Sequence, residues 1–272
     1  MTLSKRIAAL LTAGALAAFA AGCGKASDTA SNTNDTDKKV ESTPITLNIS
    51  AAASLKDSME EIKQLYTKDK SNVTLTYNFG SSGTLQQQIE QGADVDLFMS
   101  AAAKQMDDLQ SKNLIDKDSR KDLLENNIVL VTPKDNPVVK DFSDLTTDKV
   151  KKIALGEPKS VPAGQYAEEV FTKMSILDKV KGKAVYGNDV KAVLTWVESG
   201  NAEAGIVYET DAKISTKVQI AATAPADSHK AVVYPAAVVK SSKKADAAKE
   251  FLKFLSGDKA KKVFEKYGFK VN

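Results

Sequence analysis

Two loops of small and hydroxylated residues lie where an apolar, strand-like run gives way to a helix-forming run. Ser54 lies in the first loop, residues 51–55, and Ser82 lies in the second, residues 79–85, between two glycines. Glycine lets a backbone approach a guest closely, and the free N–H groups at the start of a helix favour an anion. We also expect Ser54 to cap a helix that begins at Leu55, with Asp57 three residues further on.

Three more candidate donors occur later in the chain. Ala163 precedes a predicted helix within the segment VPAG, and Val190 opens another helix after Asn188 and Asp189. Their backbone N–H groups would be among the unpaired donors of a helix start. Tyr208 ends the apolar run 204–208, where its phenol can donate. Taken singly, each also fits a plain structural role: a turn, a helix start or a core tyrosine.

Taken together, these five candidates form a set of uncharged donors. The hydroxyls of Ser54 and Ser82, the phenol of Tyr208 and the amides of Ala163 and Val190 include no lysine or arginine. Hydrogen bonds to a charged partner contribute roughly 1.5–3 kcal/mol each, so about six or seven could offset the desolvation of a small dianion. The set therefore predicts a site for a tetrahedral oxyanion.

The scarcity of histidine and cysteine argues against other chemistry. The sequence has one histidine, His229, in a polar segment, and one cysteine, Cys23. A Ser-His-Asp system needs a histidine base in a suitable turn, and a soft metal site needs several such ligands. We therefore expect no catalytic residues, no cofactor and no bound free metal ion.

The elements that would position these loops alternate between strand and helix, which predicts α/β architecture with largely parallel sheets. Strands are expected near residues 45–50, 73–79, 96–100, 128–132, 152–155, 184–186, 204–208 and 230–239. Helices are expected near residues 55–68, 84–91, 104–112, 165–174, 191–198, 243–255 and 259–267, the last ending at Gly268. The strands near Ile128 and Val232 are interpreted as two crossings between lobes. We therefore expect lobe 1 to contain residues 44–128 and 232–272, lobe 2 to contain residues 129–231, and the cleft to lie between them.

The first residues indicate export. A basic start with Lys5 and Arg6, an apolar run over residues 7–21 and the pair Gly22-Cys23 are typical of a signal peptide, residues 1–22. Cys23 resembles the acylated first residue of a bacterial lipoprotein, although Ala20 stands where leucine is usual. The polar residues 23–43 predict a flexible linker to the membrane. The formal net charge is only +3, and no basic face with interleaved aromatics predicts nucleic-acid binding.

Six stretches resemble, in order and spacing, the periplasmic molybdate-binding proteins of bacterial molybdate ABC importers. They are AAASLKDSMEEI, YNFGSSGTLQQQIEQGADVDLFMSA, GEPKSVPAGQYAEE, GIVYETDA, DSHKAVVYPAAVV and FEKYGFKV. The resemblance implies a type II periplasmic-binding-protein fold, two α/β lobes joined by a two-crossing hinge. Carried over by motif, the ligand residues are Ser54, Ser82, Ala163, Val190 and Tyr208.

The same resemblance implies molybdate or tungstate as the ligand and the permease subunits of an ABC importer as partners. We expect a monomer anchored through Cys23 to the outer face of the cell membrane, or tethered in a periplasm. Gly83 stands where many relatives carry a third small hydroxyl residue, and is expected to loosen its loop. Two alternatives stay open: a receptor for sulfate, phosphate or a phosphonate, and a hydrolase that uses Ser54 or Ser82.

Overall fold

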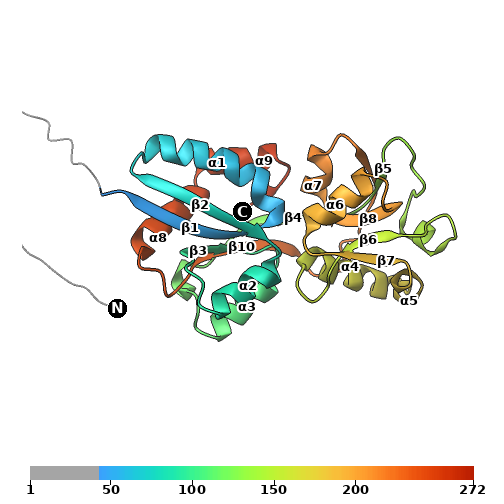
Figure 1. Cartoon of the computed structure of the whole chain (residues 1–272), viewed down its shortest axis with the longest axis horizontal. Coiled ribbons are helices and arrows are strands. Elements are labelled where there is room, and N and C mark those ends of the chain that lie inside the picture. The colour runs from blue at the N-terminus through green and yellow to red at the C-terminus, as the bar shows by residue number, and fades with distance from the viewer. Residues whose placement is uncertain (1–42) are drawn as a thin grey trace, which may run out of the picture. The chain divides into compact units, whose positions relative to one another are not determined.

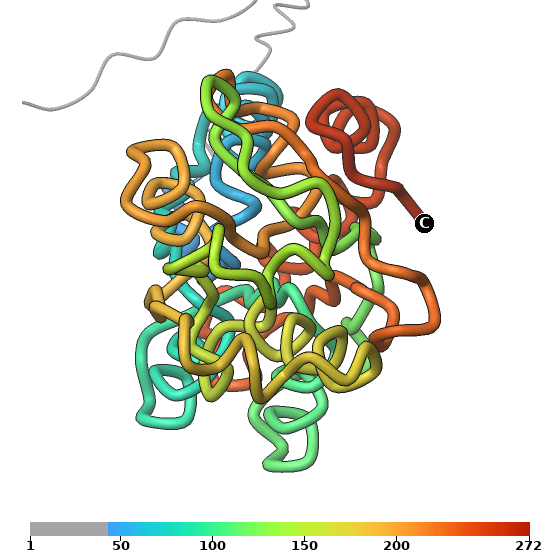
Figure 2. Tube along the Cα trace, turned by 90° about the vertical axis from the view of Figure 1, so that its right-hand side faces the viewer, coloured from blue at the N-terminus to red at the C-terminus, as the bar shows by residue number. Residues whose placement is uncertain are grey.

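The computed structural model describes residues 43–272, which contain two β-sheets, each with helices on both faces (Figure 1). The predicted signal peptide, Cys23 and the linker up to residue 42 lie outside the described residues. We call the six-stranded sheet with its helices the first lobe and the five-stranded sheet with its helices the second lobe. Figure 2 views the molecule from the second lobe, whose yellow-green to orange segments lie in front of the blue and teal segments of the first.

The first lobe has strand order β11-β4-β10-β3-β1-β2, with β1 parallel to β2 and β3, and β10 antiparallel to β3 and β4. Its strands are β1 (Ile45–Ala52), β2 (Val73–Gly80), β3 (Leu97–Met99), β4 (Lys121–Asn126), β10 (Val232–Val238) and β11 (Lys270–Val271). Its helices are α1 (Lys56–Asp69), α2 (Ser82–Glu90), α3 (Ala103–Ser111), α8 (Ala245–Leu255) and α9 (Asp258–Lys266), with short 3₁₀ turns at Ala53–Leu55 and Lys117–Ser119. The sheet is therefore mixed, where the sequence predicted a largely parallel one.

Strand β3 explains why both faces of this sheet need helices. Leu97 and Met99 pack into the core that contains α1, α8 and α9, whereas Phe98 packs into a second cluster with Leu85 and Met106 of α2 and α3. Side chains alternate between the faces of a strand, so an apolar run of this kind must be covered on both sides.

The second lobe has strand order β7-β6-β8-β5-β9, with β6 parallel to β7 and β8, and β5 antiparallel to β8 and β9. Its strands are β5 (Ile128–Pro133), β6 (Ile153–Gly156), β7 (Ala184–Gly187), β8 (Ala204–Tyr208) and β9 (Val218–Thr223). Its helices are α4 (Pro162–Lys173), α5 (Leu177–Lys181), α6 (Val190–Glu198) and α7 (Glu209–Ile214), with a 3₁₀ turn at Phe142–Thr146. Helices α4 and α6 cover opposite faces of the sheet (Figure 1).

Two segments connect the lobes. The chain leaves β4 of the first sheet and enters β5 of the second at Asn127, and it returns between β9 and β10. The predicted residue boundaries, 128/129 and 231/232, fall near these segments and stay a prediction. Asn127 donates to Glu209 at 2.5 Å beside the first crossing.

The predicted elements at the candidate loops were largely found, but three short strands were missed. Strands β4, β9 and β11 pair at or near sheet edges, and none of them alternates regularly between apolar and polar residues: β4 reads KDLLEN, β9 reads VQIAAT and β11 has only two residues. Gly268 follows Tyr267, the C-cap of α9, and has φ +90°, as expected for a glycine that ends a helix.

The topology brings the candidate loops together. In each lobe the first strand of the parallel set lies between the next two, in the orders β2-β1-β3 and β7-β6-β8. Because the strands within each of these sets run parallel, the loops that follow β1 and β2 leave one edge of the first sheet, and the loops that follow β6, β7 and β8 leave one edge of the second. Open α/β sheets bind ligands at these carboxyl ends.

Candidate functional site

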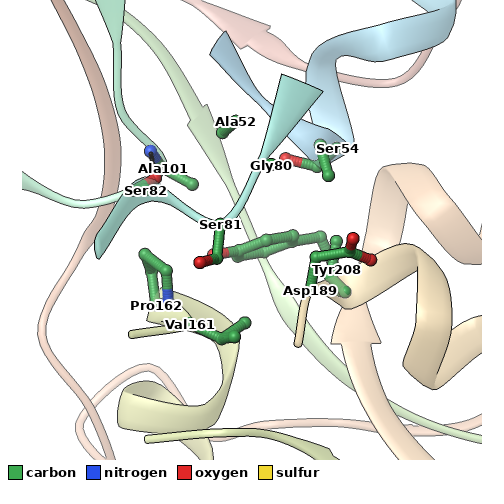
Figure 3. Close-up of a pocket in the computed structure, with 12 residues that line it drawn as sticks. Ala52, Ser54, Gly80, Ser81, Ser82, Ala101, Val161, Pro162, Asp189 and Tyr208 are labelled. Atoms are coloured by element: carbon green, nitrogen blue, oxygen red, sulfur yellow. Dashed lines mark hydrogen bonds between the residues drawn. The ribbon is translucent and has the colours of Figure 1, made fainter. Parts of the chain in front are cut away.

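A small pocket lies between the two lobes and is walled by residues from the loops at these carboxyl ends (Figure 3). The empty space within it, including space that opens to solvent, is about 200 Å³. The wall consists of Ala52, Ala53, Ser54, Gly80, Ser81, Ser82, Ala101, Val161, Pro162, Asp189, Val190 and Tyr208.

Four of the five candidate residues line this pocket. Ser54 and Ser82 come from the first lobe, and Val190 and Tyr208 come from the second. Ala163 is fully buried and is not itself a wall residue, although its neighbour Pro162 is. Residues far apart in sequence are thus gathered around one cavity, as a shared ligand would require.

Ser54 does not cap a helix, which corrects the sequence interpretation. The residues Ala53–Leu55 form a 3₁₀ turn, α1 begins only at Lys56, and its N-cap position is held by Leu55 without a side-chain hydrogen bond. The hydroxyl of Ser54 instead lies 3.0 Å from the phenol oxygen of Tyr234 on β10. Asp57, expected to complete the cap, forms an ion pair with Lys191 of the second lobe.

In the second serine loop, the adjacent hydroxyls of Ser81 and Ser82 make different hydrogen bonds. Ser81, which the sequence analysis missed, is the N-cap of α2 and accepts a hydrogen bond from the amide of Thr84 at 3.3 Å. Ser82 accepts a hydrogen bond from the amide of Ala101 at 2.9 Å. Because that contact uses an oxygen lone pair, the hydroxyl proton of Ser82 can still be donated to a guest. Helix α2 begins at Ser82, two residues earlier than predicted, so the sequence did not identify Ser81 as its N-cap.

Two helices of the second lobe begin at the pocket. Helix α4 starts at Pro162, and its N-cap, Val161, offers no side-chain hydrogen bond. Helix α6 starts at Val190, where Asp189 accepts from the amide of Ala192 at 2.8 Å. The amides of Ala163 and Val190 lie in the first turns of these helices, so they have no acceptor within their own helices. Both helix dipoles also favour a negative guest near these ends.

Tyr208 supplies a buried phenol in the middle of the wall residues (Figure 3). Its side chain is almost fully buried, and its hydroxyl has no hydrogen-bond partner among the described residues. Burial raises the pKa of Tyr208 well above its ordinary value, so the phenol keeps its proton. A buried, unpaired donor is costly unless a ligand satisfies it.

Within residues 43–272, the pocket wall contains no lysine, arginine or histidine. Its one acidic residue, Asp189, is occupied as the cap of α6. The nearby charge of Lys191 is matched by carboxylates: its ammonium lies 2.8 Å from Asp57 and 3.1 Å from Asp211. Burial raises the pKa of the Asp211 carboxyl, and Lys191 counters only part of that effect.

Direct contacts across the cleft show the lobes closed. The amide of Gly83 in α2 donates to the carbonyl of Ser160 in the second lobe at 2.9 Å. A Cβ atom on Gly83 would lie 2.6 Å from that carbonyl oxygen and 2.7 Å from the Cα of Ser160. Gly83 therefore permits close approach of two backbones, where the sequence analysis expected it to loosen the loop. The Lys191–Asp57 ion pair is a second contact between the lobes.

The serines have no histidine base beside them. His229 is not a wall residue; its Nδ1 lies 2.7 Å from the carbonyl oxygen of Lys230, and its ring packs edge-on against Tyr166. Among the described residues, no group of three or more histidine, cysteine or acidic side chains could hold a metal ion. The geometry therefore favours reversible binding of an anion by neutral donors.

Comparison with known proteins agrees with this geometry. Residues 47–270 match the family of bacterial extracellular solute-binding proteins. The chain is 51% identical to YvgL of Bacillus subtilis, provisionally named an ABC transporter substrate-binding lipoprotein, over 94% of this chain and 95% of the relative. It is 43% identical to the molybdate-binding protein ModA of Haemophilus influenzae, over 80% of this chain and 87% of the relative.

A solved structure gives the same result for the fold. The substrate-binding domain of a provisionally assigned molybdenum ABC transporter from Clostridium difficile is 50% identical and superimposes with a TM-score of 0.65. The match covers 83% of this chain and 98% of that domain. It confirms the predicted fold class, a binding protein of two α/β lobes with the ligand cleft between them.

Proposed function

Since this chain belongs to the bacterial extracellular solute-binding proteins, we propose that it captures molybdate, and tungstate with it, and delivers the oxyanion to an ABC importer. The observation that carries the proposal is the pocket between the lobes, whose largely buried wall offers uncharged donors from both of them. The 43% identity to a molybdate-binding protein supports molybdate in particular.

In the proposed complex, the oxyanion is held by Ser54, Ser82 and Tyr208 through side-chain donors and by Ala163 and Val190 through backbone amides. The two serine donors belong to the first lobe and the other three to the second. An anion bound to all five would hold the lobes together, so binding would shift the equilibrium towards the closed form. An importer can recognise such a closed form as the loaded state.

The proposal extends to the membrane. Cys23 would carry the lipid anchor, residues 23–43 would form the tether, and the permease subunits would receive the anion at the outer face of the membrane. The likeness to a named lipoprotein of Bacillus subtilis supports the anchor. Within residues 43–272, no helix has the length and apolar content needed to cross a bilayer.

The alternatives are less well supported. A receptor for sulfate would use the same neutral donors and differs mainly in the size of its cavity. Hydrogen phosphate needs an acceptor for its proton, and Asp189, the acidic wall residue, is already the cap of α6. A hydrolase would need a base beside Ser54 or Ser82, and His229 lies outside the pocket wall. We therefore propose a transport role without catalysis.

The phenol of Tyr208 offers a direct test. We expect Tyr208→Phe to weaken molybdate binding about tenfold, because a hydrogen bond to a charged ligand is lost. The thermal stability of the ligand-free protein should not fall, since this hydroxyl has no protein partner to lose. Titration calorimetry and thermal melting measure the two effects.

Tyr66→Phe is a matched control for this variant. Tyr66 on α1 is likewise buried, and its hydroxyl likewise has no hydrogen-bond partner among the described residues, but it lies in the first-lobe core outside the pocket wall. The Tyr66→Phe variant should bind molybdate with the affinity of the wild type. Equal affinities for Tyr208→Phe and Tyr66→Phe would remove the Tyr208 phenol from the binding site.

A further inference from the structure

A buried chain of hydrogen bonds leads from the hinge to the pocket serine Ser54. The side-chain amide nitrogen of Asn126, at the end of β4, donates to the phenol oxygen of Tyr234 at 3.3 Å. The Tyr234 oxygen lies 3.0 Å from the hydroxyl of Ser54. All three side chains are buried, so water does not compete freely for these contacts.

Asn126 acts as a hydrogen-bond donor to Tyr234. Its side-chain oxygen accepts from the amide of Asn127 at 2.9 Å, which fixes the orientation of the carboxamide. Its nitrogen therefore faces the hydroxyls of Thr210, at 2.9 Å, and Tyr234, and a carboxamide nitrogen can only donate. The Tyr234 oxygen thus accepts from Asn126, which leaves its phenol proton available for the oxygen of Ser54.

Ser54 lies next in this chain and faces the pocket. When Tyr234 donates to the Ser54 oxygen, the proton of Ser54 is free to point elsewhere, and Ser54 lines the pocket. Ser82 is in an equivalent state, because the amide of Ala101 donates to its oxygen. In this arrangement Ser54 and Ser82 each accept a hydrogen bond from the protein and keep a proton for the guest, whereas the third wall serine, Ser81, donates its proton to the hydroxyl of Thr84.

We propose that Tyr234 and Asn126 are positioning residues that turn the Ser54 hydroxyl into a dedicated donor to the bound oxyanion; this inference rests on the function proposed above. Neither residue belongs to the pocket wall. Each acts through Ser54, by fixing which way its proton points and by polarising its O–H bond, since hydrogen bonds in a chain strengthen one another.

Two further observations support the arrangement. Burial raises the pKa of Tyr234 well above its ordinary value, so the phenol stays protonated and able to donate. Its ring packs edge-on between Tyr208 and Phe269, with ring centroids 5.7 and 5.4 Å away. This packing holds the hydroxyl in place, and a phenylalanine at position 234 would preserve it.

A double-mutant cycle on molybdate affinity tests the proposal. The wild type, Tyr234→Phe, Ser54→Ala and the double variant are titrated with molybdate, and their ligand-free melting temperatures are compared. We expect Tyr234→Phe to weaken binding about fivefold when Ser54 is present and less than about twofold in the Ser54→Ala background, because the effect passes through Ser54. A merely structural role for Tyr234 would weaken binding equally in both backgrounds.

The outcomes separate this inference from the function on which it rests. If the wild type does not bind molybdate, the proposed function fails. If the wild type binds and the two substitutions are additive, or Tyr234→Phe alone has no effect, the positioning role is wrong. If Tyr234→Phe does not fold, the same cycle is run with Asn126→Ala, one step further from the pocket. A loss that again depends on Ser54 supports the proposal, and an additive loss overturns it.

Discussion

Gly83→Val is expected to weaken molybdate binding about a hundredfold, because the substituted side chain keeps the lobes from closing on the anion. The first atom of any side chain at this position would lie 2.6 Å from the carbonyl oxygen of Ser160, and backbone atoms cannot turn aside as a flexible side chain can. The hydrogen bond from Gly83 to Ser160 would be lost with the contact. Titration calorimetry with molybdate measures the effect.

The fold should survive this change. Gly83 lies in the first turn of α2, where a residue other than glycine has a higher helix propensity, and the clash exists only when the lobes meet. Gly182→Val is the matched control, since a Cβ at Gly182 meets nothing within 4 Å. If Gly83→Val melts and binds like the control, direct contact between the lobes is not needed for capture.

Gly164→Ala is expected to lower the stability of the second lobe by about 2–4 kcal/mol, which corresponds to a fall in melting temperature of roughly 5–15 °C. A Cβ on Gly164 would lie 2.0 Å from the carbonyl oxygen of Gly156, at the end of β6. Helix α4 would have to move away from the sheet. The expected loss exceeds the gain of about 1 kcal/mol that alanine normally brings to a helix.

Thermal melting followed by circular dichroism measures this loss without any ligand. Gly182→Ala, at the open position already described, should melt like the wild type. Since Gly164 sets the position of the α4 start, the variant should also bind molybdate less tightly at temperatures where it is still folded. A variant as stable as the wild type would show that β6 and α4 do not need this close approach.

The sequence was informative where function depends on local residue types. Ser82, Val190 and Tyr208, which line the pocket, could be picked out because small, hydroxylated or helix-opening residues follow strands, and strand ends of one lobe meet at one edge. The alternating pattern likewise predicted the α/β lobes and the two crossings. Strands β4 and β9 were missed because their apolar residues do not alternate with polar ones: β4 has two adjacent leucines and β9 ends in Ala-Ala-Thr.

What the sequence could not predict depends on contacts between distant residues. The hydroxyl of Ser54 was assigned to a helix cap, because nothing local reveals that Tyr234 lies beside it. Gly83 was interpreted within its own loop, although the backbone of Ser160 in the other lobe explains it better. Ser81 was missed because the start of α2 was placed two residues too late.

We propose that uncharged groups from both lobes bind a fully deprotonated tetrahedral oxyanion of molybdenum or tungsten. Titration calorimetry of the protein with molybdate, tungstate, sulfate and phosphate, under one set of conditions, tests this binding most directly. We expect binding of molybdate and tungstate, weaker binding of sulfate, and no binding of phosphate. No heat with molybdate or tungstate, or tighter binding of phosphate than of either, would contradict it.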